Sequence, residues 1–428
     1  MSNTLKVAAL AVLAAAASNV YADPAETKGG IKIKTEDGRF EATVGGRIQF
    51  DYYSFSEDTD AKIGTTAFGS AVVANGANRG GAAFRRTYLT LGGKAYGWEY
   101  KFENDFSTTS ANGASFREMW IARPVGPGKL IIGQHKPLRG MEELASSNEI
   151  TLMERPNTTA SGIYAGRQFL TGLFYKGNAD SFGYGLWATS LAAATAQTEG
   201  HSFGGRAYWF PLADDGRTVH VGLAYSSDRE DAGSATAAPT FQYGGRRGIS
   251  LAFGNAGTAL SSGFGTQSTI HGELAGSYGP FTAQAEYAKA TLSDAFGSAT
   301  APKDADVTAY YVQGSYFITG EKKVYKKDRG AFGSPKPIND FGAVEAVVRY
   351  ESTKNDETKA GTNGGCTTGV AALNPSITKC EASQISLGAN WYVNPNVRFM
   401  LNYYIASADF GAGKDEPEAI SVRAQMSF

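Results

Sequence analysis

The sequence predicts an all-β protein, a transmembrane antiparallel β-barrel of about sixteen strands with an inward-folded constriction loop. Three observations lead to this prediction. A short apolar segment opens the chain, no later stretch is apolar for the length of a membrane-spanning helix, and long segments alternate apolar and polar residues up to the last position. The 428 residues include 53 Gly, 22 Tyr and 24 Phe, which suit turns, pleated strands and the aromatic girdles of outer-membrane barrels.

Residues 1–22 have the pattern of a cleaved secretory signal peptide. Lys6 precedes an apolar core from Val7 to Ala17, and Val20-Tyr-Ala22 places tolerated residues before an expected cut. The core is too short to cross a membrane as a helix. A poorly amphipathic N-terminal helix is the alternative. We expect residues 23–428 to form one barrel domain without a separate plug domain.

The first and last predicted strands show the alternation most clearly. In residues 39–52, apolar side chains such as Ile48 alternate with polar ones such as Arg47. The thirteen residues 40–52 span roughly 43 Å at about 3.3 Å each, which exceeds the roughly 25 Å apolar band of an outer-membrane barrel. In residues 418–428 the apolar face ends on Phe428. A terminal aromatic residue on such a strand resembles the outer-membrane insertion signal.

The same period of two recurs in later segments, at residues 218–225, 270–278, 344–351, 384–393 and 397–405. Their polar faces carry charged residues such as Glu273, Glu345 and Arg349. These charges would be costly in lipid, whereas an aqueous lumen accommodates them. A soluble β-sandwich or β-helix also alternates, but it leaves the terminal strand unexplained and would turn its polar face outward.

Short and long connections alternate between the predicted strands. Tight reversals at residues 95–98, 214–216, 279–280 and 394–396 are typical of periplasmic turns. Extracellular loops are predicted for the longer stretches rich in Gly, Ala, Ser and Asp, at residues 54–82, 229–265, 292–305, 322–340 and 355–381. The segment 137–160 is less rich in Gly and partly helical in pattern. We expect it to fold into the barrel and narrow the passage.

Composition excludes several classes of function. The formal net charge is −1, so the chain has no basic footprint for nucleic acid. Cys366 and Cys380 lie in one stretch rich in Gly and Thr, and the oxidising exported compartment favours a disulfide between them. A metal site is the alternative, but it lacks further Cys or His ligands. We expect no metal and no cofactor.

One motif raises the possibility of an enzyme. Gly200-His-Ser-Phe-Gly204 matches the nucleophile elbow of hydrolases, in which a strand turns sharply into a helix and exposes the serine. The residues that follow have the pattern of another strand, and the remaining histidines lie on separate elements without triad spacing. We therefore expect no enzyme activity. An outer-membrane esterase that uses Ser202 is the remote alternative.

Arginines near the predicted strands are candidate anion ligands. Arg47 lies in mid-strand on the polar face, Arg86 faces inward, and Arg85 by parity faces outward above the apolar band. Arg246 and Arg247 lie in the longest predicted loop, near the pore mouth. Guanidinium groups keep their charge and match phosphate or carboxylate oxygens. Arginines near loop ends could instead contact lipopolysaccharide or pair with loop acids, but Arg47, which faces inward in mid-strand, has no lipid headgroup to contact.

These residues together resemble the phosphate-selective porin O and P family over nearly the whole mature chain. The resemblance rests on Gly45-Gly-Arg-Ile-Gln49, Phe84-Arg-Arg-Thr-Tyr88, Glu154-Arg155 after Ser146-Ser147, Arg247-Gly-Ile-Ser250, Thr319-Gly-Glu321 with Tyr325-Lys326, Arg349-Tyr350 and Asn390-Trp-Tyr392. It implies a homotrimer of sixteen-stranded barrels with an inward-folded third loop. It also implies an arginine ladder matched by Arg47, Arg85, Arg86 and Arg247, and a lumenal aspartate at Asp105.

The chain departs from the family pattern at the expected constriction. The family's constriction lysines fall at Glu143 and Asn148, with Glu142 adjacent, and two family arginines fall at Pro239 and Phe241. Carboxylates at a narrow point would repel a multiply charged anion.

Nearby basic residues could neutralise these carboxylates. Lys136, Arg139 and Arg155 are the candidates, and Glu154 is a further constriction residue. We expect a passive, water-filled channel in the bacterial outer membrane, in contact with lipid and lipopolysaccharide. It should prefer small anionic solutes, with phosphate or polyphosphate as candidates. The alternative is a general or neutral-solute diffusion porin.

Overall fold

The computed structural model describes most of the mature chain, at residues 30–56, 80–107, 115–159, 163–164, 168–191, 200–230, 240–242, 250–253, 266–298, 301–355, 366–367, 381–409, 414–416 and 418–428. The predicted signal peptide, Arg246, Arg247 and Cys380 lie outside the described residues. The signal peptide and the disulfide between Cys366 and Cys380 therefore stay predictions.

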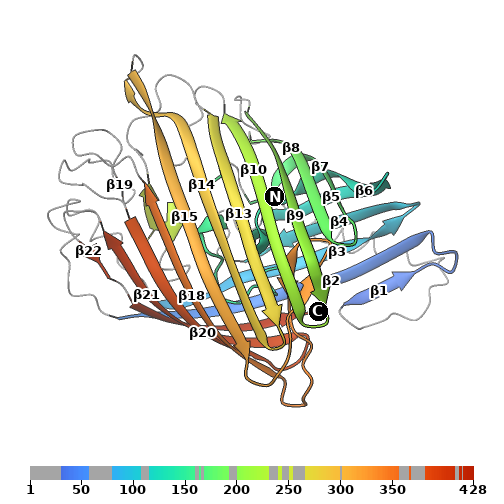
Figure 1. The fold of residues 1–428 in the computed structure, drawn as a ribbon. Coiled ribbons are helices and arrows are strands. Elements are labelled where there is room, and N and C mark those ends of the chain that lie inside the picture. The colour runs from blue at the N-terminus through green and yellow to red at the C-terminus, as the bar shows by residue number, and fades with distance from the viewer. Residues whose placement is uncertain are drawn as a thin grey trace, which may run out of the picture.

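Sixteen antiparallel strands close into a barrel, which confirms the predicted fold class (Figure 1). Each strand pairs with its neighbour in chain order, and the last strand pairs with the first and closes the sheet. The strands are β2 (Phe40–Phe55), β3 (Gly81–Ala95), β4 (Trp98–Asp105), β5 (Ser115–Val125), β6 (Gly128–His135), β7 (Leu170–Asn178), β8 (Phe182–Ser190), β9 (Gly200–Asp214), β10 (Arg217–Glu230), β13 (Thr266–Tyr278), β14 (Phe281–Ser298), β15 (Ala301–Phe317), β18 (Ala343–Asn355), β20 (Glu381–Tyr392), β21 (Val397–Asp409) and β23 (Glu418–Ser427).

Shorter elements decorate this barrel. Strand β1 (Ile31–Lys34) pairs with the start of β2, at residues 41–44. Strand β23 pairs with the same edge of β2 from Arg47 onward. Strand β22 (Lys414–Asp415) pairs with β21, and β11 (Thr240–Gln242), β12 (Ser250–Phe253) and β19 (Cys366–Thr367) form a small separate sheet. A hairpin is made by β16 (Val324–Lys326) and β17 (Ala331–Gly333). The helical turns are α3 (Met141–Leu144) and η3 (Asn157–Thr159).

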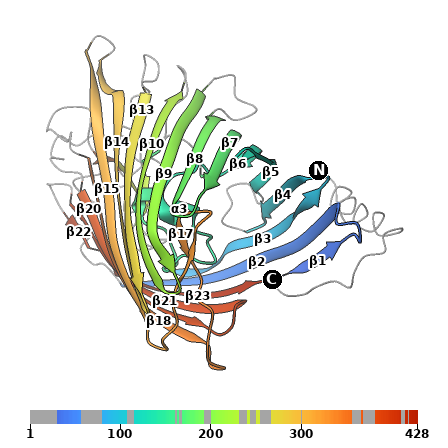
Figure 2. The same cartoon turned by 45° about the vertical axis from the view of Figure 1, so that its right-hand side comes forward.

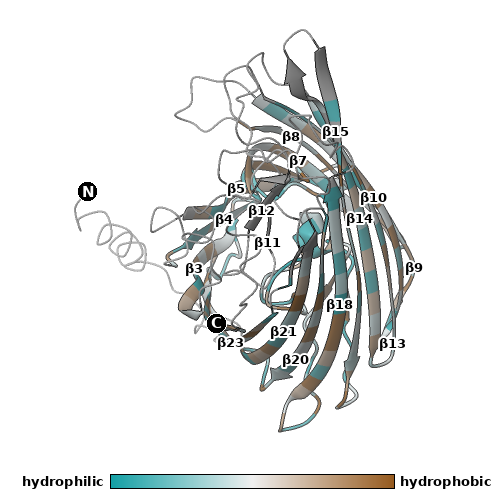
Figure 3. Cartoon of the chain, turned by 90° about the vertical axis from the view of Figure 1, so that its left-hand side faces the viewer, coloured by the Kyte–Doolittle hydropathy of each residue, from teal (hydrophilic) through white to brown (hydrophobic). Residues whose placement is uncertain are grey.

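Apolar and polar residues alternate along the strands around β18 (Figure 3), and successive side chains of a strand point to opposite faces of the wall. Leu223 and Leu274 are 60% and 59% exposed on the outer face, whereas His220 and Glu273 are buried on the inner face. Charged side chains therefore gather inside the barrel, and the apolar band faces outward. Among the described residues, no helix combines the length and the apolar character needed to cross a bilayer.

The tight turns lie at one end of the barrel, as predicted for the periplasmic side. The turn between β3 and β4 uses Tyr96 and Gly97 at φ 51° and 82°, and Gly279 has φ 56° between β13 and β14. Positive φ is strained for most residues but not for glycine. The strand ends that border most of the longer connections lie at the opposite end.

Two predicted extracellular loops are wrong. Most of residues 292–305 extends β14 and β15 into one long hairpin. Residues 322–340 belong to the connection 318–342 between β15 and β18, which lies at the same end as the tight turns. We call residues 318–342 the periplasmic hairpin. Its polar, Gly-containing composition does not distinguish it from an extracellular loop. Because each strand crosses the barrel once, the number of preceding strands decides whether a connection is periplasmic or extracellular.

Candidate functional site

The third loop connects β6 to β7 over residues 136–169, and its described residues lie inside the barrel, as predicted for the segment 137–160. Figure 2 shows α3 of this loop and β17 of the periplasmic hairpin within the ring of strands. An irregular segment leaves backbone carbonyls without sheet partners, and side chains of the wall satisfy several of them. Arg398 donates to the carbonyls of Ile150 and Thr151 at 2.8 and 3.1 Å, and Asn390 donates to that of Thr151 at 2.8 Å.

Apolar contacts hold the beginning of the same loop. Leu138 packs in a buried cluster with Phe174, Trp187, Ala122 and Ile131, against which Leu144 also packs. Strand β8 approaches Leu138 so closely that a Cβ on Gly185 would lie 2.5 Å from Leu138 Cδ1 and 2.8 Å from its Cβ. Glycine is therefore required there for the loop to lie against the wall.

A cavity of about 470 Å³ remains between the third loop and the wall formed by β2 to β9. We call it the lumenal cavity. Among the described residues that line it are eight basic and four acidic side chains. The basic ones are Arg47, Arg86, Lys101, Lys136, Arg155, Lys176, Arg206 and Arg329, and the acidic ones are Glu99, Glu103, Glu118 and Asp328. The cavity therefore has an excess of positive charge.

Arg47 and Arg86 both line the lumenal cavity from the first two barrel strands. Arg47 Nη1 donates to Ser147 Oγ at 2.6 Å, and its Nη2 lies 3.3 Å from Glu103 Oε2. The Arg47 guanidinium also lies over the Tyr88 ring, 4.7 Å from its centre. Arg86 donates to Gln49 Oε1 at 2.9 Å. Within the described residues, Arg86 has no carboxylate at ion-pair distance.

The prediction that Arg85 faces outward is wrong. The pairing of β2 with β3 shifts between Gln49 and Phe50, so that Arg86 lies opposite Gln49 and Phe84 lies opposite Phe50. Such a bulge inserts one extra residue and interrupts the alternation of faces. Arg85 consequently points inward, beside Arg86, and its Nε and Nη2 donate to Glu154 at 2.7 and 2.9 Å.

Lys136 and Arg155 bring the two ends of the third loop together at the cavity. Lys136 Nζ donates to the Glu143 carbonyl at 2.6 Å and lies 3.5 Å from Glu143 Oε1. Arg155 donates to the carbonyls of Glu142 and Ala145 at 2.8 and 2.6 Å. Burial and the neighbouring Arg155 charge lower the pKa of Lys136 to about 7, against the opposing effect of Glu143. Lys136 thus lies within ion-pair distance of Glu143, the carboxylate that the sequence analysis paired with a nearby cation.

The other predicted constriction residues of the loop point away from the lumenal cavity. Glu142 accepts from Gln284 of the opposite wall at 2.9 Å, and burial raises the pKa of its carboxyl. Arg139 lies over the Tyr164 ring, 3.6 Å from its centre. Asn148 acts through its carbonyl, which accepts from Gln425 at 3.2 Å. The expected repulsion of anions by Glu142 is therefore not supported by its position.

Asp105 lies in the lumen at the end of β4, where it forms an ion pair with an arginine of β5. Arg117 Nη2 donates to Asp105 Oδ2 at 2.9 Å, and the backbone N–H groups of Thr87 and Ser107 donate to Oδ1. Asp105 is thus a structural partner of β5 and does not line the lumenal cavity.

Sequence reasoning missed several cavity residues, namely Lys101, Lys176, Arg206 and Arg329. Parity could have found Arg206, because it shares a face with buried Tyr208 and Phe210 while Trp209 is 54% exposed. It could have found Lys101 in the same way. Arg329 lies in the periplasmic hairpin, and no local pattern places that segment inside the barrel.

Ser202 lies within strand β9, which continues to Asp214 without a turn into a helix. Its hydroxyl is buried and accepts from Trp187 Nε1 at 3.0 Å. The strained turn of a nucleophile elbow is absent from this strand. The hydrolase interpretation of the motif is therefore wrong.

A closed sixteen-stranded barrel, with an apolar outer band, an inward-folded loop and a charged cavity, defines the chain as an outer-membrane porin. The chain belongs to the family described as phosphate-selective porin O and P, which matches residues 44–428. It is 30% identical to Porin O of Pseudomonas aeruginosa over 98% of this chain and 97% of that protein. Its bacterial location is therefore the outer membrane.

Solved structures share the fold at low sequence identity. The outer membrane channel DcaP of Acinetobacter baumannii has a TM-score of 0.57 at 13% identity, covering 92% of this chain and 99% of its own. The anion-selective porin from Comamonas acidovorans has a TM-score of 0.57 at 12% identity, covering 91% and 100%. The trimer form of OmpT, an outer membrane protein of Vibrio cholerae, has a TM-score of 0.53 at 10% identity, covering 91% and 99%.

Proposed function

We propose that the chain forms a passive, water-filled outer-membrane channel that prefers small anions, with phosphate as the candidate physiological solute. The observation that carries this proposal is the excess of basic side chains around the lumenal cavity. A charged lining in a narrow pore raises the local concentration of counter-ions and lowers that of co-ions. Family membership supports phosphate or a related oxyanion as the solute.

The positions of Arg86, Lys136 and Arg155 strengthen the proposal. They come from β3 and from the two ends of the third loop, yet they line one cavity. The charges of Arg86 and Arg155 both disfavour protonation of Lys136, so each of the two arginines repels the Lys136 ammonium electrostatically. A bound oxyanion would relieve this repulsion and could accept forked hydrogen bonds from the guanidinium groups.

Planar-bilayer recording in a KCl gradient tests the proposal. We expect a reversal potential on the anion side and a decrease of chloride current when inorganic phosphate is added. Replacing Arg47 with Ala should reduce the anion preference, because it removes a cation and leaves Glu103 less compensated. Arg47→Lys is the matched control and should retain most of the preference. Cation preference of the unmodified channel would contradict the proposal, and an unselective channel would favour the general diffusion porin.

We also propose that the channel assembles as a homotrimer. The family resemblance implies this state, and the trimer form recorded for the Vibrio cholerae protein of the same fold supports it. Chemical crosslinking of intact outer membranes should yield a species of three chains. A product limited to one chain would count against it.

A further inference from the structure

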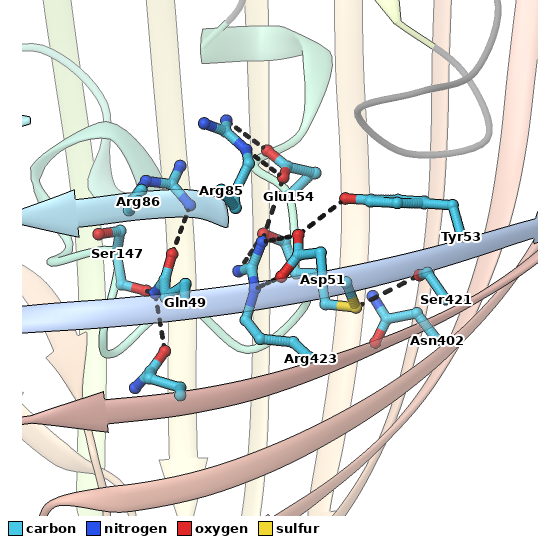
Figure 4. Close-up of polar contacts among 12 residues, drawn as sticks. Gln49, Asp51, Tyr53, Arg85, Arg86, Ser147, Glu154, Asn402, Ser421 and Arg423 are labelled. Atoms are coloured by element: carbon cyan, nitrogen blue, oxygen red, sulfur yellow. Dashed lines mark hydrogen bonds and ion pairs between the residues drawn. The ribbon is translucent and has the colours of Figure 1, made fainter. Parts of the chain in front are cut away.

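Four charged side chains, Asp51, Arg85, Glu154 and Arg423, form an ion network that joins the third loop to the wall (Figure 4). Arg85 donates two parallel hydrogen bonds to Glu154, at 2.7 and 2.9 Å. Arg423 donates a matching pair to Asp51, both at 2.7 Å, and its Nη2 lies 3.3 Å from Glu154 Oε1. Two cations and two carboxylates thus neutralise each other.

This network lies where the barrel closes. Asp51 of β2 and Arg423 of β23 are direct cross-strand partners in the pairing of the first and last strands. Arg85 comes from the bulge in β3, next to the same strand. Glu154 is the member that comes from the third loop, and Arg423 also donates to the carbonyl of Met153 at 2.7 Å. The loop is therefore fixed to the closing strands by both side-chain and backbone contacts.

Arg86 has different surroundings although it follows Arg85 in the chain. It lines the lumenal cavity with Lys136 and Arg155, and neither Arg85 nor Glu154 lines that cavity. Its hydrogen-bond partner is the neutral amide of Gln49. The charge of Arg86 is thus available to a solute, whereas that of Arg85 is matched by Glu154.

We propose that the two adjacent arginines have separate roles in this channel. Arg85 is a positioning residue that holds the third loop through Glu154, and Arg86 supplies charge to the anion pathway. The forked guanidinium matters at Arg85, because a lysine cannot make two parallel hydrogen bonds to one carboxylate. The role of Arg86 rests on the proposed anion preference. The role of Arg85 is independent of it and differs from the ladder position that the family resemblance implied.

Single-channel recording separates the two roles, because reversal potential reports selectivity and open-channel fluctuations report movement of the loop. Arg85→Lys keeps the charge and loses the fork, and Glu154→Gln removes the anionic partner. Either change should increase, by at least about tenfold, the fraction of time that the loop spends away from the wall, since each weakens hydrogen bonds to a charged group. This increase appears as more frequent open-channel fluctuations. The double variant should fluctuate no more than the stronger single variant, because both break the same contact.

Arg86→Gln is the matched control and should lower the anion preference while fluctuations stay at the unmodified level. Arg85→Lys should keep the anion preference. The positioning role is overturned if Arg85→Lys shows no more current fluctuation than the unmodified channel. It is also overturned if the effects of the two single variants add in the double variant. Unchanged selectivity of Arg86→Gln would count against the proposed function alone. Heat-modifiable migration in detergent gels verifies that each variant has folded. If Arg85→Lys does not fold, Glu154→Gln still tests the positioning role of Arg85.

Discussion

Lys136 places a titratable charge at the narrow part of the pore. Its ammonium lies between the Glu143 carboxylate and the basic side chains that share the lumenal cavity. A base with a lowered pKa is protonated below that pKa and neutral above it. Since the pKa of Lys136 is about 7, the cavity loses positive charge as the pH rises through neutrality.

The anion preference of the channel should therefore decrease as the pH rises through about 7. Arg keeps its charge at any such pH, so Lys136→Arg should flatten the dependence. Reversal potentials measured at several pH values check this. His135 also lines the cavity, but it is unchanged in Lys136→Arg, so any slope that it contributes is common to both channels. Equal slopes for the unmodified channel and Lys136→Arg would refute the role of Lys136.

At the scale of elements, the periplasmic hairpin narrows the pore from the other end. Arg206 of β9 donates to the carbonyls of Arg329 and Gly330 at 2.6 and 2.9 Å. Lys323 pairs with Glu345 of β18 at 3.0 Å, so the hairpin is attached to two distant parts of the wall. Phe332 packs against Met141 of the third loop. The two inward segments therefore support each other.

Removing residues 327–330 should raise the single-channel conductance, because Asp328 and Arg329 line the lumenal cavity. The barrel itself should remain folded, since β16 and β17 pair with each other and not with the wall strands. Bilayer recording and gel migration measure the two effects. A conductance equal to that of the unmodified channel would show that the hairpin does not limit the passage.

Local patterns in the sequence predicted what depends on neighbouring residues. The period of two located the wall strands and their inner faces, and the Gly-poor segment after β6 located the inward loop. Contacts between distant segments were beyond that reasoning. Arg398 and Arg423 look like ordinary lumenal residues until the loop carbonyls are placed beside them. One extra residue at the bulge reversed the direction of Arg85, and parity has no means of detecting such an insertion.

At the scale of the whole molecule, the charges of the interior are unevenly distributed. The third loop makes polar contacts with β14 and β21, whereas the lumenal cavity lies on the side formed by β2 to β9, where basic lining residues exceed acidic ones. The net charge of the whole chain is −1. Selectivity is thus set by where the charges lie and not by their sum.

Salt should weaken this selectivity. The Debye length falls from about 10 Å at 0.1 M to about 3 Å at 1 M ionic strength, so fixed charges around a cavity act over a shorter range. Reversal potentials measured at the same KCl ratio but different absolute concentrations should show less anion preference at high salt. A preference that is constant over this range would point to direct binding as its source.

The attachment of the third loop to both Arg85 and Arg423 also bears on the order of events during biogenesis. The loop comes from the first half of the chain, but Arg423, which holds it, lies on β23, the last strand of the barrel. A chain in which β23 has not yet paired with β2 therefore lacks part of the attachment of this loop. We therefore expect the third loop to reach its final position only after the first and last barrel strands have paired.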